Sequence, residues 1–192
     1  MIFFSFVLAV CGSIDIRNSV DEFRVIENCT VIEGHLEIVL IEHAASEEYD
    51  RLHFPKLLEI TDYLLLYRVY QMRTLSHIFP NLSVIRGQLL FFNYALVLFE
   101  VPHIEEIGLP SLTTIGRGAV RLEKNPNLCY LHTIKWIDIV SEDFNKTNFI
   151  KENKETEECV DFCPQRCPGR KCWTADHCQI QDTSEYFKSN SI

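Results

Sequence analysis

A short phrase that returns every 25 to 30 residues constrains this chain more than any other feature. It reads Phe/Leu-Pro-x-Leu-x-x-Ile and occupies residues 54–60, 79–85 and 109–115, and a degenerate copy ends at Ile32. Internal periods of about 20 to 50 residues are typical of solenoids, in which each unit buries its apolar face only by stacking on its neighbours. The sequence therefore predicts a mainly β solenoid, either leucine-rich-repeat-like or a β-helix.

Alignment of the repeats on the closing isoleucine stacks four predicted strands. Successive side chains of a strand point to opposite faces, so alternate columns belong to the core. Two apolar columns are predicted to point inward, with one extra residue in the last repeat at the 116–118 turn: Leu36, Leu64, Leu89 and Val120, and Ile38, Leu66, Phe91 and Leu122. The columns between them are predicted to face outward: Glu37, Leu65, Leu90 and Arg121, and Val39, Tyr67, Phe92 and Glu123.

The predicted outer face is apolar and aromatic at its centre. The outer strands carry charge there, whereas the two middle strands carry Leu65, Tyr67, Leu90 and Phe92. An apolar centre with a polar rim is typical of a protein–protein site. The alternative is that another part of the chain covers this face, although little chain remains after residue 130 to do so.

Composition narrows the class of function. The chain has 192 residues, 47% of them hydrophobic, and a formal net charge of −9, which fits one domain with an appendage and argues against a nucleic-acid partner. The sequence contains no Gly-rich phosphate loop, H-E-x-x-H or G-x-S-x-G motif, and its seven histidines are scattered. We therefore expect no enzymatic activity, no cofactor and no metal site.

Eight cysteines and three glycosylation sequons favour the secretory route. Five of the cysteines lie between 159 and 178, with spacings that match no common zinc finger. An even number of cysteines in a secreted chain indicates disulfides. The sequons begin at Asn28, Asn81 and Asn145, which are the predicted glycosylation sites.

The ends of the chain differ from its repeats. Residues 1–10 resemble a partial or short signal peptide without a charged first region, and no run of about 18 apolar residues predicts a membrane span. We expect the repeat domain over 11–158, a truncated cysteine-rich module over 159–180 and a disordered tail over 181–192. Short helices are predicted after Ser19, where a capping box begins, and over 131–140.

Several segments together resemble a known family. They are 15–18 (DIRN), 27–34 (ENCTVIEG), 62–66 (DYLLL), 79–87 (FPNLSVIRG), 91–97 (FFNYALV) and 121–125 (RLEKN). In order and spacing they resemble the first L domain of the insulin and insulin-like growth factor receptors, from about Cys11 to Cys178. The tail with Cys172-Trp173 resembles the start of that family's furin-like cysteine-rich region. The resemblance implies a right-handed β-helix, the receptor L domain fold, with short helices and a small disulfide-rich module.

The resemblance also implies a hormone site on the outer face. Carried over by position, the implied contacts are Arg17, Asn18, Glu37, Val39, Leu40, Tyr67, Arg68, Phe91, Phe92, Asn93, Tyr94, Val97, Phe99, Arg121, Glu123 and Lys124. The strand alternation adds Leu65 and Leu90. It disagrees with the resemblance at Phe91, which the column alignment places in the core.

The disulfide pairing is implied by the resemblance alone, since eight cysteines allow 105 pairings. The implied bridges are Cys11–Cys29, Cys129–Cys159, Cys163–Cys172 and Cys167–Cys178.

Two classes of function follow. The first is an extracellular module that binds insulin-like peptide hormones, either as a receptor fragment or as a soluble decoy without a kinase, with full-length receptor chains as further partners. The second is a secreted structural or adhesive repeat protein that binds another partner through the same face. Glu37 and Glu42 depart from the vertebrate receptors, which have Gln or His at the first position and, in the insulin receptor, Phe at the second. The receptor helix that completes the family's hormone site is absent from this sequence, so we expect weak binding.

Overall fold

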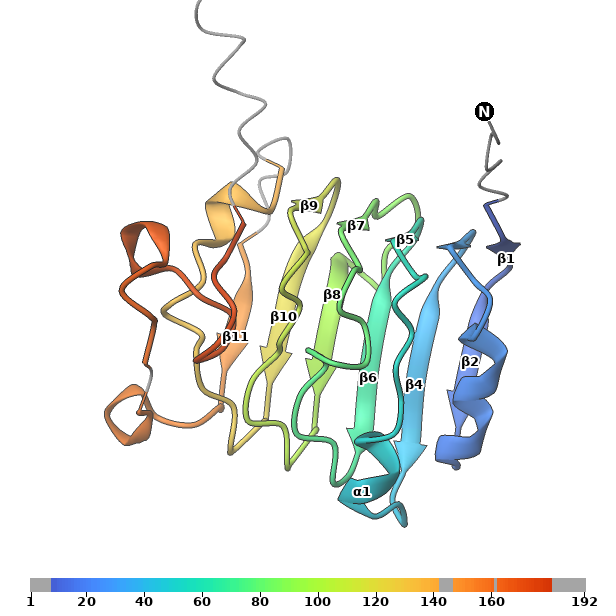
Figure 1. Ribbon diagram of the computed structural model, residues 1–192, viewed down its shortest axis with the longest axis horizontal. Helices are drawn as coiled ribbons and strands as arrows, with labels where there is room; N and C mark the ends of the chain where they lie inside the picture. Colours follow the sequence, from blue (N-terminus) through green and yellow to red (C-terminus); the bar gives the residue numbers. More distant parts are fainter. Residues whose placement is uncertain (1–7, 142–146, 161, 181–192) are drawn as a thin grey trace, which may run out of the picture.

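The computed structural model describes residues 8–141, 147–160 and 162–180 (Figure 1). The predictions for residues 1–7, for the sequon at Asn145 and for the tail at 181–192 lie outside the described residues. Within them, the fold is a β-solenoid of about four turns, which confirms the mainly β prediction.

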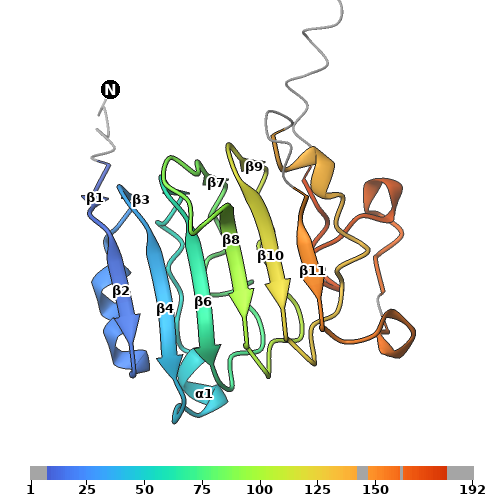
Figure 2. The same ribbon diagram turned by 180° about the vertical axis from the view of Figure 1, so that it is seen from behind.

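Two parallel sheets form the walls of the solenoid (Figures 1 and 2). The narrow sheet stacks two-residue strands in the order β1 (Val10–Cys11), β3 (Val31–Ile32), β5 (Glu59–Ile60), β7 (Val84–Ile85) and β9 (Thr114–Ile115). The wide sheet runs in the order β11 (Phe149–Lys151), β10 (Ala119–Glu123), β8 (Tyr94–Phe99), β6 (Leu64–Val69), β4 (Leu36–Ile41) and β2 (Ile14–Arg17). The chain visits the two sheets alternately, so each repeat contributes one strand to each wall.

The repeated phrase explains the narrow sheet. The closing isoleucines Ile32, Ile60, Ile85 and Ile115 are register partners on consecutive strands and are fully buried. The leucine of each phrase, at Leu57, Leu82 and Leu112, is also fully buried. β-branched side chains suit parallel strands whose inner face is buried. The period of the sequence is therefore the period of the stack.

Within residues 8–141, 147–160 and 162–180, helical structure is confined to single turns and one short 3-10 helix. That helix, η1 (Val20–Ile26), begins after Ser19, whose hydroxyl accepts a hydrogen bond from the Asp21 amide, and it buries Val20, Phe23 and Ile26. The others are α1 (Ser46–Tyr49), η2 (Trp136–Asp138), η3 (Thr156–Glu158) and η4 (Pro168–Arg170). The predicted helix over 131–140 is wrong in extent.

Strand β8 lies seven residues later in the sequence than the third strand of the column alignment. Leu96 and Leu98, not Leu89 and Phe91, pair with Leu64 and Leu66 and with Val120 and Leu122. The reason is an insertion, because Leu96 lies eleven residues after Ile85, whereas Leu64 lies four residues after Ile60. The inward prediction is therefore wrong for Leu89, which is 67% exposed, and for Phe91. The outward prediction is wrong for Leu90, which packs against the main core.

Four disulfides stabilise the N-terminal end of the solenoid and the C-terminal module. Cys11–Cys29 lies at the N-terminal end, Cys129–Cys159 joins the solenoid to the module, and Cys163–Cys172 and Cys167–Cys178 lie within the module, the same pairing that the resemblance implies. The fully buried Trp173 lies edge-on to Trp136, with ring centres 5.9 Å apart. Among the described residues, no helix is long and apolar enough to cross a membrane.

Candidate protein-binding face

The strands of the wide sheet lie side by side (Figure 2), and two rows of side chains cross its outer face. Strand pairing places six residues side by side in each row. The first row is Asp15, Glu37, Leu65, Val97, Arg121 and Phe149, and the second is Arg17, Val39, Tyr67, Phe99, Glu123 and Lys151. Each row is apolar in the middle and charged toward at least one end, as a binding face with a polar rim requires.

An apolar cluster separate from the main core occupies the centre of this face. Val39, Leu65 and Val97 are nearly buried, and partly exposed side chains surround them: Leu40, Tyr63, Tyr67, Phe91, Tyr94 and Phe99. The cluster opens into a shallow hollow of about 260 Å³, lined by Leu65, Tyr67, Phe91, Phe92, Val97, Phe99 and Arg121. Apolar side chains gathered at such a hollow offer a pocket for an anchoring side chain of a partner.

The inserted segment before β8 forms one wall of the hollow, through Phe91 and Phe92. Phe91 and Tyr94 exchange two backbone hydrogen bonds of 3.0 Å, so the chain reverses tightly at Phe92 and Asn93. Phe92 has a left-handed backbone, with φ of 56°. Phe91 packs on the cluster, while Phe92 is 80% exposed. This segment thus covers part of the face and adds an exposed aromatic ring to it.

Arg121 marks the basic side of the hollow. Its Nε donates to Glu123 over 2.8 Å, and its guanidinium lies 5.2 Å from the centre of the Phe99 ring and 5.5 Å from that of Phe149. Lys124 is 5.4 Å from the same Phe99 ring and 3.6 Å from Glu100. Cations held over aromatic faces in this way are attracted by the ring quadrupole and keep a fixed position. The side of the hollow is therefore ordered before any partner arrives.

The opposite edge of the face is acidic. Arg17 donates to Glu37 over 3.0 Å, and the Tyr63 hydroxyl donates to the same carboxylate over 2.8 Å. Burial, and after it the hydrogen bond to Glu37, raises the pKa of the Tyr63 hydroxyl above its usual range. Tyr63 therefore stays a donor and holds the Glu37 side chain in place.

Residues with a left-handed backbone conformation form the border of the face at the C-terminal ends of the strands. Backbone φ is between 51° and 65° at Asn18, Leu40, Arg68, Glu100, Lys124 and Glu152, one for each strand of the wide sheet. A non-glycine residue pays about 1–2 kcal/mol for this conformation. The same bend in every coil breaks the strand alternation, so these side chains line the edge of the face. Arg68 and Glu100 pair there over 2.8 Å, and the guanidinium, which donates to that carboxylate, lowers the pKa of Glu100.

Nearly all the sequence-predicted contacts meet on this face. The exception is Leu90, which faces the main core. Phe91, which the alternation places inward and the resemblance outward, lies in the outer cluster.

Sequence reasoning missed seven residues of the face and its border: Asp15, His35, Tyr63, Glu100, Phe149, Lys151 and Glu152. Asp15 lies in β2, whose alternation Ile-Asp-Ile-Arg is a readable strand pattern. Phe149 lies in β11, a strand that the repeat alignment does not predict.

Comparison with known proteins places these features in a family. The family model described as "Receptor L domain" matches residues 28–140, more than half of the chain. The "Insulin-like peptide receptor" of Branchiostoma lanceolatum is 56% identical over 176 residues, and the "Insulin receptor" of Xenopus laevis is 50% identical over 185 residues. The "Putative molluscan insulin-related peptide(s) receptor" of Lymnaea stagnalis is 51% identical over 170 residues.

The similarity covers most of this chain and a small part of each relative. In all three comparisons it spans 88% of this chain. It spans 13% of the first two relatives and 10% of the third.

Proposed function

This chain belongs to the receptor L domain family, in its insulin-receptor branch, and from that premise we propose that it binds an insulin-like peptide hormone through the outer face of its wide sheet. The observation that carries the proposal is the apolar hollow beside the exposed Phe92 ring. Three similar proteins are named as receptors of insulin or of insulin-like peptides, which supports this class of ligand.

The build of the face supports a peptide as the ligand. Large aromatic rings and an arginine are the side chains that dominate binding energy at interfaces. Here the stacked pair of Tyr67 and Phe99, with ring centres 5.5 Å apart, lines the hollow together with Phe92 and Arg121. A helix or strand of a small protein that presents one or two apolar side chains matches this shape. The Glu37 carboxylate at the acidic edge favours a ligand with a positive charge at that end.

We place the protein outside the cytoplasm, with glycans on Asn28 and Asn81. Four disulfides with no free cysteine among the described residues support an oxidising compartment. Both asparagines are exposed. Expression in a eukaryotic secretory system, followed by glycosidase, is expected to lower the mass, and less so for Asn28→Gln or Asn81→Gln. A mass that glycosidase leaves unchanged would contradict this placement.

Binding is tested with labelled insulin and labelled insulin-like growth factor on the purified chain. Phe92→Ala and Arg121→Ala are each expected to weaken binding by about 30-fold or more, the loss of roughly 2 kcal/mol typical of an interface hot spot. The matched control is Phe162→Ala, which removes a 63% exposed phenylalanine from the C-terminal module and is expected to leave affinity unchanged. If neither peptide binds, or if all three variants bind alike, the face serves another partner, as in a secreted adhesive protein.

A further inference from the structure

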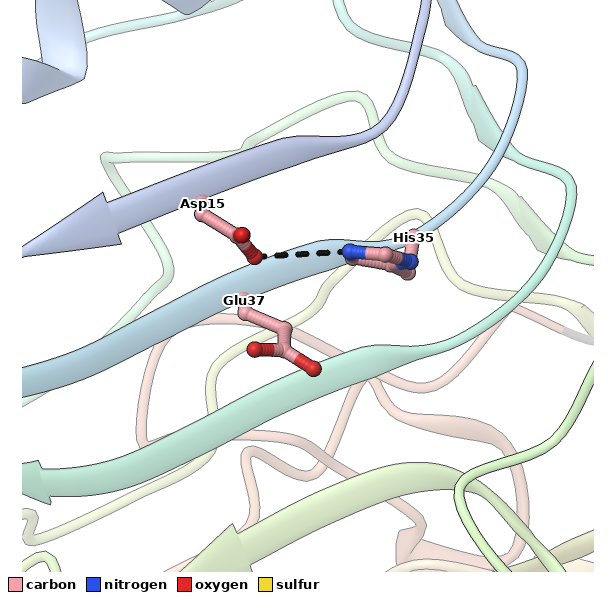
Figure 3. Close-up of side chains that lie close together, drawn as sticks. All are labelled: Asp15, His35 and Glu37. Atoms are coloured by element: carbon pink, nitrogen blue, oxygen red, sulfur yellow. Dashed lines mark ion pairs between the residues drawn. The ribbon is translucent and has the colours of Figure 1, made fainter.

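Three side chains with metal-ligating atoms converge at the acidic edge of the wide sheet (Figure 3). Asp15 on β2 is the register partner of Glu37 on β4, and His35 immediately precedes β4. One ligand atom from each of the three lies within 4.8 Å of the other two. The sequence gives no hint of this group, because its members come from two strands and share no local motif.

The spacing of the atoms suits a small divalent cation. In a tetrahedral zinc site with bonds of about 2.0–2.2 Å, neighbouring ligand atoms are about 3.4 Å apart. The Nε2 atom of His35 lies 3.3 Å from Oδ1 of Asp15, which already meets this requirement. Glu37 needs only a small side-chain movement to complete three ligands. One imidazole and two carboxylates favour zinc over calcium or magnesium, which prefer sites made of oxygen alone.

The two carboxylates of Asp15 and Glu37 favour a bound cation. Asp15 and Glu37 are directly opposite each other on neighbouring strands, an arrangement in which like charges are destabilising. Arg17 now offsets both, 3.0 Å from Glu37 and 3.7 Å from Asp15, and its side chain is 48% exposed. One arginine against two carboxylates leaves a net negative charge, which a divalent ion would neutralise.

Tyr63 supplies the supporting contacts that metal sites need. Its hydroxyl donates to Oε1 of Glu37, which leaves Oε2, the atom now held by Arg17, for a metal. Its ring stacks on His35, with centres 5.1 Å apart and planes 14° apart. Contacts of this kind fix the orientation of ligands, and their loss typically weakens metal affinity by about 10–100-fold.

We propose that Asp15, His35 and Glu37 form a zinc site in which the metal replaces the guanidinium of Arg17. Oδ1 of Asp15, Nε2 of His35 and Oε2 of Glu37 are the three protein ligands, and water takes the fourth position. Arg17 is then a competitor for the site, which distinguishes this arrangement from an ordinary surface ion-pair network.

The experiment is calorimetric titration of the disulfide-bonded chain with zinc near neutral pH, after removal of metal by a chelator. We expect one equivalent to bind. Asp15→Asn, His35→Gln and Glu37→Gln should each weaken binding by more than about tenfold, and Tyr63→Phe by about tenfold. Arg17→Ala should bind zinc more tightly than the natural chain, because it removes the competing cation. Circular dichroism of each variant shows that it is folded.

The matched control is His43→Gln, which removes an exposed histidine outside the cluster and should leave zinc binding unchanged. The proposal is overturned if the natural chain binds no zinc, if the ligand variants bind as it does, or if His43→Gln lowers affinity as much as His35→Gln. It is equally overturned if Arg17→Ala leaves zinc affinity unchanged or weakens it. Hormone binding plays no part in this readout, so the site and the proposed function are tested separately.

Discussion

Phe91 and Phe92 are adjacent in sequence and lie edge to face, with ring centres 5.0 Å apart and planes at 89°, yet only Phe91 is packed into the outer apolar cluster. Phe92 is 80% exposed beside it. In an extended strand the two rings would point to opposite faces of the sheet, whereas the tight reversal of the chain at Phe92 lets both line the same hollow. One phenylalanine therefore supports the face, while its neighbour is presented to a partner.

This relationship predicts different effects of two alanine substitutions on stability. Phe91→Ala should lower the free energy of unfolding by roughly 1–2 kcal/mol, because it removes a partly buried ring from the contact with Tyr63. Phe92→Ala should change it by less than about 0.5 kcal/mol. Urea unfolding of both variants measures this. A loss of 3 kcal/mol or more at Phe91, roughly the cost of emptying a core site, would contradict its placement in the outer cluster.

Substitutions at two leucines test the register of β8. Leu98 is fully buried between Leu66 and Leu122, so Leu98→Ala should cost about 2–5 kcal/mol. Leu89 is 67% exposed in the inserted segment, so Leu89→Ala should cost less than about 0.5 kcal/mol. Thermal or urea unfolding of the pair measures the difference. A larger loss of stability for Leu89→Ala than for Leu98→Ala would contradict this register and would place Leu89 in the core.

The sequence predicts the solenoid and most of its register because polar residues mark the outer face. In β4 and β10, Glu37 and Arg121 alternate with buried aliphatic residues, so the face of each strand can be read directly. The segment 88–99 has no such mark, since a charged residue first appears at Glu100. The seven inserted residues therefore leave the apolar pattern unbroken, and the alternation assigns the wrong residues to β8.

The candidate site was less predictable than the fold. The resemblance places Phe91 on the correct face, whereas periodicity does not, because the tight turn at Phe92 depends on backbone contacts with Tyr94. The convergence of Asp15, His35 and Glu37 depends on the pairing of β2 with β4. A sequence pattern carries no direct information on either contact.

A buried asparagine ties three coils of the solenoid together. Asn125 is fully buried, accepts from the Val101 amide over 3.0 Å and donates to the Leu98 carbonyl over 3.1 Å and to Asn153 over 2.9 Å. Asn125→Leu should lower the free energy of unfolding by roughly 2–4 kcal/mol, because two buried backbone groups lose their partner. Chemical denaturation measures the loss.

The control for this substitution is Asn127→Leu. Asn127 is exposed and makes one hydrogen bond, to the Pro102 carbonyl over 2.8 Å, so the change should cost less than about 1 kcal/mol. Equal losses for the two variants would show that the buried hydrogen bonds of Asn125 are not a special source of stability.

The raised pKa values of Tyr49 and Tyr63 predict that the protein loses stability at alkaline pH. Burial, and after it the neighbouring Glu48, raises the pKa of the Tyr49 hydroxyl well above its usual range. In the unfolded chain tyrosine ionises near pH 10. Above this pH the unfolded state releases a proton that the native state keeps, so the free energy of unfolding falls as pH rises, by about 1.4 kcal/mol per pH unit for Tyr49.

Tyr49→Phe should therefore flatten the decline of stability between about pH 10 and 11. Near neutral pH it should be neutral or stabilising, since the Tyr49 hydroxyl is buried without a hydrogen-bond partner among the described residues. Tyr63→Phe, which removes the second raised pKa, should also flatten the slope. Urea unfolding across this pH range measures both slopes, and slopes equal to that of the natural chain would refute the assignment.

Photo-crosslinking from Phe92 tests hormone binding at the outer face most directly. A photoreactive phenylalanine analogue is placed at position 92 and, in a second protein, at position 162, which is exposed on the C-terminal module. Each is irradiated with labelled insulin and, separately, with labelled insulin-like growth factor. At least one peptide should crosslink at position 92, unlabelled peptide should compete with it, and position 162 should give no such product. Crosslinking that is equal at the two positions, or absent at position 92, would contradict hormone binding at this face.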